Sequence, residues 1–367
     1  MRIGVDARNL VPCPSGIGRY VLEMCRALSD QGHSLILYLP EAPHDSLPPL
    51  PRCELRVGNF KGPWLRVFWS VKALPEAARK DQLDLFWGPA HRLPPGLPSH
   101  LPTIVTIHDL VWLKAAETMN WQTWLGERAF MKASLKRANH ILADSEATAK
   151  DVIEFYSGAA GRVDVVYPGL TTLPSQNGRA FVPVDDQGRQ HRYALFVGTV
   201  EPRKNLARLL QAFASIKPSS LCGLKLVIAG GQGWRMGDLS SLIAQHRLQD
   251  RVILTGHVSD AELARLYASA DFLLMPSIYE GFGFPIIEAQ SFGVPVITSN
   301  CSSMPEVAGK AAICVNPHNT SEIAEAILRL ASDEDLRAEL SAESRKNASR
   351  FSWTRASEAL INTATSF

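Results

Sequence analysis

The sequence of 367 residues has little net charge, no long apolar run and no closely paired cysteines. Its 38 Lys and Arg nearly balance 36 Asp and Glu, so the net charge of +2 gives no overall footprint for nucleic acid. No stretch approaches the roughly 18 apolar residues of a membrane span. The first residues, Met1–Asp6, lack the apolar run of a signal peptide, so we expect a cytoplasmic protein.

The six cysteines stand far apart, and no Cys-x-x-Cys pair occurs among them. This spacing excludes a zinc knuckle and a thioredoxin-type motif. We expect the thiols to be reduced and packed as small apolar side chains. The composition, with 46% hydrophobic and 20% charged residues, is typical of a soluble globular enzyme and excludes disordered or collagenous chains.

The length exceeds what one core usually supports, because domains commonly contain about 100–200 residues each. Short apolar, β-branched runs alternate with segments of helical period, and this β-α-β pattern occurs twice. In the first half we predict strands over Arg2–Ala7, Ser34–Leu39, Leu83–Trp87, Thr103–Ile107, His140–Ala143 and Val163–Tyr167, with a helix over Tyr20–Gln31. In the second half we predict strands over Tyr193–Val197, Lys225–Ala229, Val252–Thr255, Phe272–Met275 and Val296–Thr298, and helices over Leu206–Ser215, Gly237–His246, Asp260–Ser269 and Pro285–Phe292.

Between the two halves the periodicity fails and Pro, Gly, Gln and Asp accumulate, which is typical of a linker. We therefore predict an α/β protein with two doubly wound domains, 1–172 and 192–351, joined by a linker over 173–191. Apolar strands such as Thr103–Ile107 indicate sheets covered on both faces. A last helical stretch, from about 352 to 367, could pack on either domain.

Glu280 and Glu288 flank the loop Gly281-Phe282-Gly283-Phe284, which follows a predicted strand. Pro285 stands where a helix should begin, so backbone amides at a positive helix end could bind a phosphate. The glycines would allow close approach, and the two carboxylates could accept hydrogen bonds from hydroxyl groups. These residues point to a ligand such as a nucleotide sugar; the alternative is a capped loop with two solvated glutamates.

Arg203 and Lys204 follow the strand that ends at Val197, after Gly198 and Thr199. Ligands of open α/β sheets bind at such strand ends. Two cations there could neutralise a diphosphate, Arg through a two-pronged contact and Lys as a point charge. The alternative is a surface turn with basic residues.

In the first half, Gly16 and Gly18 follow the first strand and open a helix, a position that suits a phosphate. Val21 stands where a dinucleotide fingerprint has its third Gly, so a classical NAD site is disfavoured. His108 and Asp109 come directly after another strand, which places an imidazole and a carboxylate at the mouth of a cleft between domains. A structural hydrogen-bonding role for His108 remains the alternative.

These motifs together resemble the retaining glycosyltransferases of family 4. Glu280 to Glu288 forms a Glu-x7-Glu motif, and the other matching segments are Gly16–Gly18, His108-Asp109 and Gly198–Lys204. Further similar runs are Gly256-His257-Val258, Leu266-Tyr267, Ala270-Asp271 and Gly293–Ile297. The resemblance covers nearly the whole chain.

The resemblance implies the GT-B architecture, in which two Rossmann-like domains face a cleft, the first binding acceptor and the second a nucleotide-sugar donor. It implies that Arg203 and Lys204 hold the donor diphosphate while the Gly16 and Gly18 segment closes over it. The last helix would cross back onto the first domain.

By the same resemblance, Glu280 would bind sugar hydroxyls, and the amides of Gly281 and Phe282–Phe284 would bind the sugar and the distal phosphate. Glu288 would bind the ribose, His257-Val258 the base, and His108 with Asp109 would face the sugar. One departure is Thr199, because many members place an Arg directly after the glycine that corresponds to Gly198. Arg203 is the candidate to replace it.

We expect no cofactor and no metal, because no Asp-x-Asp follows a strand. Asp333-Glu334-Asp335 has that spacing but precedes a helical pattern and is expected to cap a helix. Cations and helix amides would instead stabilise the departing diphosphate. The resemblance implies front-face attack, with a leaving phosphate oxygen taking the acceptor proton and no covalent intermediate.

The run Glu201–Asn205 looks most like bacterial mannosyl- and rhamnosyltransferases of surface polysaccharide assembly, such as O-antigen or exopolysaccharide synthesis. We therefore expect GDP-mannose or a GDP-6-deoxymannose as donor, with UDP- and dTDP-sugars as rivals. Two segments, Phe60–Lys72 and Trp121–Arg137, mix aromatic and basic residues. They could lie on an anionic membrane and admit a polyprenyl-diphosphate-linked acceptor, or be core aromatics beside solvated cations.

Two other functions remain open at this point. A nucleotide-sugar 2-epimerase of related fold would also need a diphosphate site, although Glu-x7-Glu favours transfer. A catalytically silent sugar-nucleotide-binding protein would keep the sites of the second domain and lose His108 or Gly16, and both are present.

Overall fold

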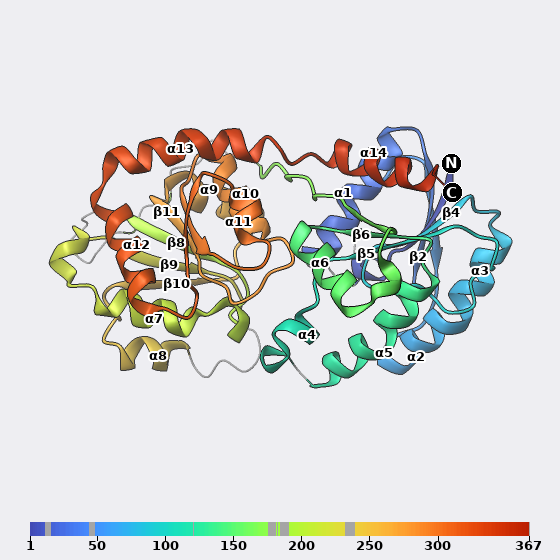
Figure 1. Ribbon diagram of the computed structural model, residues 1–367, viewed down its shortest axis with the longest axis horizontal. Helices are drawn as coiled ribbons and strands as arrows, with labels where there is room; N and C mark the ends of the chain where they lie inside the picture. The colour runs from blue at the N-terminus through green and yellow to red at the C-terminus, as the bar shows by residue number, and fades with distance from the viewer. Residues whose placement is uncertain are drawn as a thin grey trace. The chain divides into compact units, whose positions relative to one another are not determined.

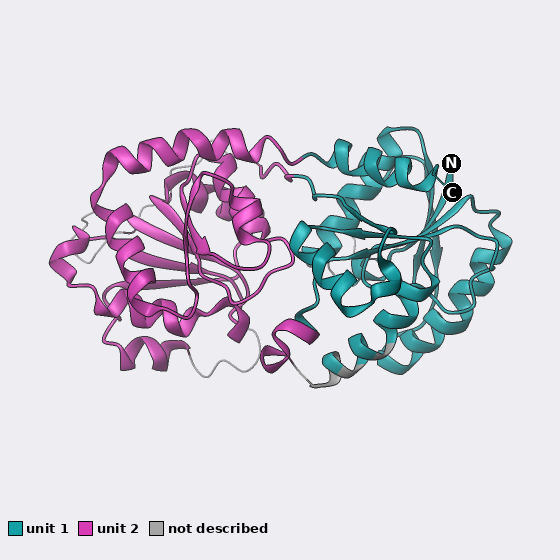
Figure 2. Ribbon diagram, in the orientation of Figure 1, with its two compact units in different colours: residues 1–112, 121–169, 352–367 teal, residues 113–120, 170–351 magenta. Residues whose placement is uncertain are grey.

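The computed structural model describes residues 1–11, 16–43, 48–119, 121–174, 181, 183, 191–231 and 239–366. The chain forms two compact units (Figure 2). Unit 1 contains Met1–Trp112, Trp121–Gly169 and Ser352–Phe367, and unit 2 contains Leu113–Asn120 and Leu170–Phe351. Most of the predicted linker, namely 175–180, 182 and 184–190, lies outside the described residues.

Unit 1 is built on a parallel sheet of seven strands in the order β3-β2-β1-β4-β5-β6-β7. The strands are β1 (Arg2–Asp6), β2 (Ser34–Leu39), β3 (Cys53–Val57), β4 (Leu85–Gly88), β5 (Thr103–Ile107), β6 (His140–Ala143) and β7 (Val163–Val165). Every residue of β5 is buried, which confirms the prediction from its apolar run. Such burial is typical of a parallel strand covered on both faces.

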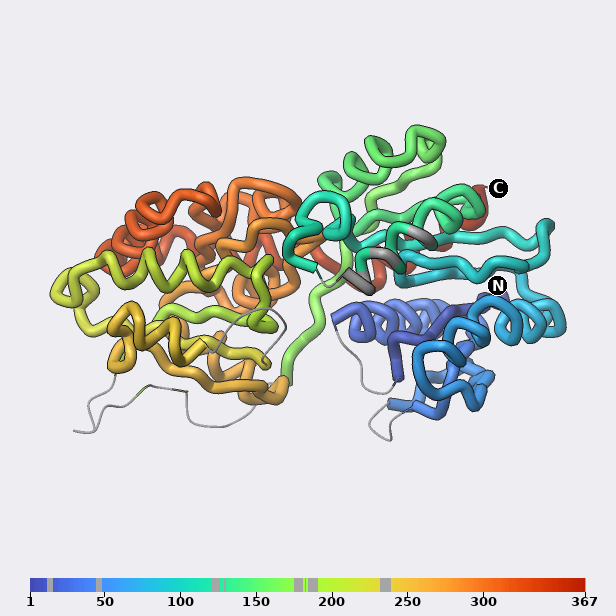
Figure 3. Tube along the Cα trace, turned by 90° about the horizontal axis from the view of Figure 1, so that it is seen from below, coloured from blue at the N-terminus to red at the C-terminus, as the bar shows by residue number. Residues whose placement is uncertain are grey.

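The helices of unit 1 follow its strands in the usual β-α-β manner. They are η1 (Arg8–Leu10), α1 (Gly16–Asp30), α2 (Pro63–Phe68), η2 (Trp69–Ala73), α3 (Leu74–Lys80), α5 (Trp121–Arg137), α6 (Glu146–Phe155), η4 (Ser157–Ala159) and α14 (Trp353–Ala364), while α4 (Val111–Lys114) spans the division between the units. Helices α2, η2 and α3 form one helical run, drawn in light blue in Figure 3. Helix α14 packs along α1.

Unit 2 has a six-stranded parallel sheet in the order β10-β9-β8-β11-β12-β13. Its strands are β8 (Tyr193–Val197), β9 (Lys225–Ala229), β10 (Val252–Gly256), β11 (Phe272–Met275), β12 (Val296–Ser299) and β13 (Ala312–Val315). Its helices are η3 (Ala116–Thr118), η5 (Pro202–Lys204), α7 (Leu206–Ser215), η6 (Pro218–Leu221), α8 (Leu239–Gln245), α9 (Asp260–Ser269), α10 (Phe284–Ser291), α11 (Met304–Ala308), α12 (Thr320–Ser332) and α13 (Glu334–Ala348). In Figure 1, α10, α11 and α13 lie above this sheet and α7 and α8 below it.

The core of unit 2 forms where α7 and α12 pack on the sheet. Helix α7 contributes Leu209, Leu210 and Phe213, and α12 contributes Ile323 and Ile327, all of them fully buried. Their spacing of three and four residues gives each helix one apolar face. This core holds β8 and β9 in place and fixes where the loops after these strands begin.

Both sheets show the doubly wound topology that the sequence predicts, and the α/β fold class is confirmed. Several predicted boundaries need correction. The helix predicted from Tyr20 is already formed at Gly16, so Gly16 and Gly18 lie in the first described turn of α1, as expected of residues that open a helix. Helix α10 begins at Phe284, one residue before Pro285, and α8 is described only from Leu239. The pattern failed to predict strands β3 and β13.

Two smaller expectations can be compared with the structure. Asp333 caps α13, since its side chain accepts a hydrogen bond of 2.9 Å from Leu336 N. The five described cysteines are free, and Cys25 is buried. Cys222, however, is exposed, so the prediction of packed thiols is wrong there.

Each sheet has one position where the order of the strands reverses. In unit 1 the chain passes from β1 through β2 to β3 and then returns to place β4 on the other side of β1. In unit 2 the corresponding position lies between β8 and β11. Ligands of open α/β sheets bind outside the carboxyl ends of the strands at such a switch point.

Candidate active site

Three side chains that the sequence singles out meet at the switch point of unit 2. Arg203 and Lys204 lie in η5, which follows β8, and Glu280 follows β11. Lys204 Nζ lies 2.7 Å from Glu280 Oε1, and Arg203 Nη1 donates to Glu280 Oε2. The structure thus brings together residues that are more than seventy positions apart in the chain.

The loop after β8 is held by further contacts of Arg203 and Asn205. Arg203 Nη1 donates to Tyr279 O at 2.9 Å, and its Nη2 donates to Glu201 Oε1 at 2.5 Å. Asn205 has a left-handed φ of 61° and donates from Nδ2 to Pro276 O and Pro317 O at 2.9 and 2.7 Å. These bonds attach η5 to the end of β11.

The charges in this cluster are buried and compensate each other. Glu280 is only 6% exposed and Glu201 5%. Burial tends to raise the pKa of Glu280, but the charges of Arg203 and Lys204 outweigh it and lower that pKa to about 2. Glu280 is therefore ionised at neutral pH. An anion that binds these two cations must compete with Glu280 for them.

The loop after Glu280 is fixed by two serines that precede α11. Ser302 Oγ accepts from Glu280 N at 3.1 Å, and the single Ser303 O–H is shared between Glu280 O and Phe282 O, which lie 2.9 and 3.0 Å from Ser303 Oγ. Because a trans peptide directs its N–H opposite to its C=O, the Gly283 N–H points away from Ser303. The loop thus presents this N–H on the side opposite to the serines.

Helix α10 begins directly after this loop. Its N-cap residue Gly283 has a φ of 99°, a conformation that a residue with a Cβ rarely adopts. The first turn of any helix has N–H groups without an intrahelical partner and a partial positive charge. Glu288, one turn further, is 7% exposed and accepts a hydrogen bond of 2.9 Å from Tyr267 Oη.

Glycines lie at the carboxyl ends of β8, β9 and β10. Gly198 and Gly230 have φ angles of 146° and 155°, and a Cβ on Gly230 would lie 2.0 Å from Gly198 O. Gly256, the last residue of β10, has a φ of 68°, and His257 and Val258 follow it at the same edge. The segments that follow β8, β10 and β11 therefore lie at the same carboxyl edge of the sheet.

Thr199, the departure from the family pattern, is exposed. Arg203, the candidate replacement for an arginine there, is already bonded to Glu201 and Glu280. It lies beside Lys204, so both cations are present at the strand end.

His108 lies in unit 1, at the carboxyl end of β5, and is 7% exposed. Its Nδ1 is 2.6 Å from Asp144 Oδ2 and its Nε2 is 2.7 Å from Pro89 O. Since a carbonyl only accepts, Nε2 carries a proton. Tyr20 packs edge-on against the ring, with centroids 4.7 Å apart. Within unit 1 both ring nitrogens are thus used to fix the imidazole.

Asp109 accepts a hydrogen bond of 3.1 Å from Val111 N, at the start of α4. Gly16 is exposed, and a Cβ there would meet no described atom within 4 Å, whereas Gly18 is buried. The roles that the resemblance gives to Asp109, Gly16 and Gly18 stay predictions.

Several residues that complete these networks were not predicted from the sequence. Asp144, His91 and Glu127 lie in unit 1, and His91 Nδ1 is 3.3 Å from Glu127 Oε2. Burial lowers the pKa of His91, but the hydrogen bond and the charge of Glu127 raise it by more than burial lowers it. The pKa of His91 is therefore raised overall. The left-handed φ of 62° at His91 has no local signal in the sequence.

Two family models match the chain. The model described as "Glycosyl transferases group 1" matches residues 185–347, and "Glycosyltransferase Family 4" matches residues 14–172. The chain is a family 4 glycosyltransferase. It is 29% identical over 365 residues to O-antigen chain mannosyltransferase B from Escherichia coli, with 95% of each chain covered. It is 28% identical to the serotype-specific mannosyltransferase WbdA from the same organism, covering 68% of this chain but 32% of that one.

Solved structures show the same fold as this glycosyltransferase. Sucrose-phosphate synthase from Thermosynechococcus elongatus has a TM-score of 0.78 at 20% identity, covering 100% of this chain and 98% of the other. The glycosyltransferase WaaG, involved in lipopolysaccharide biosynthesis, has a TM-score of 0.75 at 18% identity, covering 100% of each chain. Anabaena HepE with UDP and glucose has a TM-score of 0.74 at 17% identity, also covering 100% of each chain.

These matches confirm the resemblance and the GT-B fold inferred from the sequence. They favour glycosyl transfer over 2-epimerisation. No helix in the described part of the glycosyltransferase is long and apolar enough to cross a membrane.

Proposed function

We propose that this glycosyltransferase moves a hexose from a nucleotide sugar to a glycan or lipid-linked acceptor, with retention of configuration and without a metal. The observation that carries the proposal is the buried cluster of Arg203, Lys204 and Glu280 at the switch point of unit 2. Two cations beside a helix N-terminus can stabilise the charge of a departing diphosphate.

The donor would lie along the carboxyl edge of the unit 2 sheet. The base would bind near His257 and Val258, the ribose at Glu288, and the diphosphate at Arg203 and Lys204. On donor binding Glu280 would exchange part of its ion pairing for hydrogen bonds with sugar hydroxyls. We propose a GDP-linked mannose or 6-deoxymannose, because the relatives reported above are named as mannosyltransferases. UDP- and dTDP-sugars are the rival donors, and HepE was solved with UDP.

In the proposed reaction the bond between the anomeric carbon and the phosphate oxygen breaks while an acceptor oxygen bonds to the same face of that carbon. The acceptor proton passes to the leaving phosphate oxygen. Glu280 is poorly suited to act as a covalent nucleophile, because both of its oxygens already accept hydrogen bonds from cations. His108, oriented by Asp144, would position the sugar through its ring or its backbone.

Unit 1 would bind the acceptor during surface polysaccharide synthesis at the cytoplasmic face of a membrane. None of the six residues of α2 is buried, and Trp64 is 87% exposed. Leu65 and Phe68 are 50% and 49% exposed. Aromatic and apolar side chains beside basic ones favour a membrane interface.

Testing the donor starts with a thermal-shift screen of nucleotide sugars, since a ligand at 100 times its Kd stabilises by about 2.7 kcal/mol. The stabilising donor is then incubated with and without a lipid-linked glycan acceptor in EDTA. Release of nucleoside diphosphate only with acceptor, and a retained anomeric configuration by NMR, are expected. Dependence on added Mg²⁺, an inverted product or a trapped adduct on Glu280 would contradict the proposal.

A further inference from the structure

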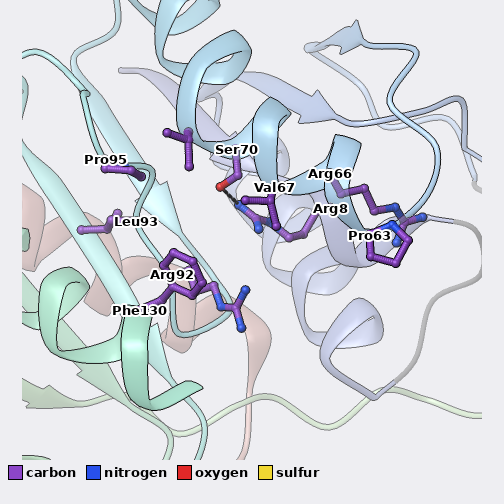
Figure 4. Close-up of a pocket in the computed structure, with 10 residues that line it drawn as sticks. Arg8, Pro63, Arg66, Val67, Ser70, Arg92, Leu93, Pro95 and Phe130 are labelled. Carbon is purple, nitrogen blue, oxygen red and sulfur yellow. Dashed lines mark hydrogen bonds between the residues drawn. The ribbon is translucent and has the colours of Figure 1, made fainter. Parts of the chain in front are cut away.

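Unit 1 contains a pocket at its own switch point. Its volume is about 250 Å³, and it is lined by Arg8, Pro63, Arg66, Val67, Ser70, Val71, Arg92, Leu93, Pro95 and Phe130 (Figure 4). Arg8 follows β1, and Arg92 to Pro95 follow β4, the strand beside it. The pocket therefore occupies in unit 1 the position that the Arg203 cluster occupies in unit 2.

Three arginines line this pocket, and no carboxylate is among its described lining residues. Each arginine is held by a carboxylate outside the lining: Arg8 by Asp6 at 2.5 Å, Arg92 by Glu127 at 2.9 Å, and Arg66 by Glu41. Such pairs fix the direction of a guanidinium group but use only some of its five donors.

The guanidinium groups are also held by neighbours within the pocket. Arg8 Nη2 donates to Ser70 Oγ at 2.7 Å, as the dashed line in Figure 4 shows. The Arg92 guanidinium lies over the Phe130 ring, 4.9 Å from its centroid. Arg66 Nε is buried and has no hydrogen-bond partner within the described residues. Fixed donors of this kind suit a planar or tetrahedral oxyanion.

The rest of the lining is apolar. Val67 lies on one wall, and Leu93, Pro95 and Phe130 lie on the opposite wall (Figure 4). Val71 also lines the pocket. A volume of about 250 Å³ corresponds to roughly eight waters at about 30 Å³ each, which is more than a single ion needs. The pocket therefore fits a phosphate group together with part of an apolar chain.

The α2 helix, which carries Pro63, Arg66 and Val67 of the pocket, also exposes Trp64 and Phe68. A chain that leaves the pocket can therefore run along an apolar surface. We propose that this pocket binds the diphosphate of a polyprenyl-type acceptor, with the Arg8, Arg66 and Arg92 side chains as its donors. The inference rests on the proposed function and assigns the acceptor's charged group to a defined place.

Binding of farnesyl diphosphate to the full chain tests this proposal, with inorganic diphosphate and farnesol as comparison probes. Arg66→Gln and Arg92→Gln should each weaken farnesyl diphosphate binding roughly ten- to hundredfold, as expected for the loss of a charged hydrogen bond. Arg92→Lys, which keeps the charge, should lose less. Arg56→Gln is the matched control, because Arg56 has the same 37% side-chain exposure as Arg66 and pairs with Asp81 away from the pocket.

Equal affinity of wild type, Arg66→Gln and Arg92→Gln for farnesyl diphosphate would overturn the proposal. If inorganic diphosphate binds as tightly as farnesyl diphosphate, the pocket is a site for free anions. If farnesol binds as tightly, the pocket is an apolar groove without anion recognition. Either result would overturn the proposal. Nucleoside diphosphate affinity, measured in parallel, reports on unit 2. If wild type does not bind nucleoside diphosphate, the proposed function is contradicted. The farnesyl diphosphate measurements would still show whether the pocket in unit 1 binds its ligand.

Discussion

Replacing Glu280 with Gln should separate stability, nucleotide affinity and turnover. The substitution keeps the shape of the side chain but leaves Arg203 and Lys204, only 18% and 11% exposed, without their shared carboxylate. Removing one partner of a buried ion pair costs about 3–5 kcal/mol. At about 2–4 °C per kcal/mol for a domain of this size, the melting temperature of unit 2 should fall by roughly 10 °C.

The affinity for nucleoside diphosphate should rise in Glu280→Gln, although the stability of unit 2 falls. In the wild type a diphosphate competes with Glu280 for the two cations, whereas in Glu280→Gln the cations are available. A recovered charged hydrogen bond is worth about 1.5–3 kcal/mol, so affinity should rise about tenfold or more. Sugar transfer should nevertheless fall by about a hundredfold, which corresponds to about 2.7 kcal/mol of lost transition-state stabilisation. Calorimetry with GDP and UDP and a transfer assay measure the two effects.

Asp271→Asn is the matched control for this prediction. Asp271 pairs with Arg192 at 2.5 Å, and these residues precede β11 and β8, the same two strands at their opposite ends. This variant should lose stability without any change in nucleotide affinity. If Glu280→Gln instead weakens nucleoside diphosphate binding in proportion to transfer, Glu280 does not compete with the diphosphate and the reasoning fails.

Three further predictions concern neighbouring residues. The pKa of Glu127 is lowered to about 2, since the hydrogen bonds and charges of His91 and Arg92 outweigh burial, and that of His91 is raised. The contribution of Glu127 to stability is lost as the pH falls through its folded pKa, and the contribution of His91 is lost as the pH rises through its folded pKa. Both contributions are therefore present between about pH 4.5 and 6.5, where the free energy of urea unfolding should differ most between Glu127→Gln and wild type. Gly230→Ala should destabilise unit 2 by about 1–3 kcal/mol or more and weaken nucleotide binding, because its Cβ would clash with Gly198 O. Gly231→Ala, whose Cβ would meet no described atom within 4 Å, should be near neutral in the same melts. Tyr267→Phe removes a hydrogen bond to Glu288 and should raise the donor KM several-fold with a smaller change in kcat, and an unchanged KM would argue against ribose binding there.

Sequence pattern predicts the buried elements of this fold well. The strands β2, β5, β6, β8, β9 and β11 and the helices α7 and α9 have the predicted bounds. Each strand is a short apolar run bounded by polar or turn residues, and each helix has one apolar face. The edge strand β3 escaped prediction, since only half-buried or exposed residues form it and no apolar run marks it.

For the site, the sequence predicts positions but not contacts. Motifs after β8 and β11 identify Arg203, Lys204 and Glu280, because both loops follow recognisable strands. That Glu280 pairs with both cations depends on β11 lying next to β8, which is a property of strand order and not of local sequence. The same reason explains why Asp144 and the three-arginine pocket were not predicted, since their members come from separate segments that only the sheet brings together.

The two switch points compensate their cations in different ways, and the difference fits the two substrates proposed. In unit 2 one buried carboxylate, Glu280, bridges both cations, so the proposed diphosphate would compete with it, and Glu280 could pair with both cations again when the diphosphate leaves. In unit 1 each arginine has its own carboxylate outside the pocket, so an anion can use the remaining donors without displacing any of them. Exchange favours a ligand that is released after every turnover, as a donor nucleotide is. A pocket with uncontested donors favours a charged group that stays bound while the sugar is added.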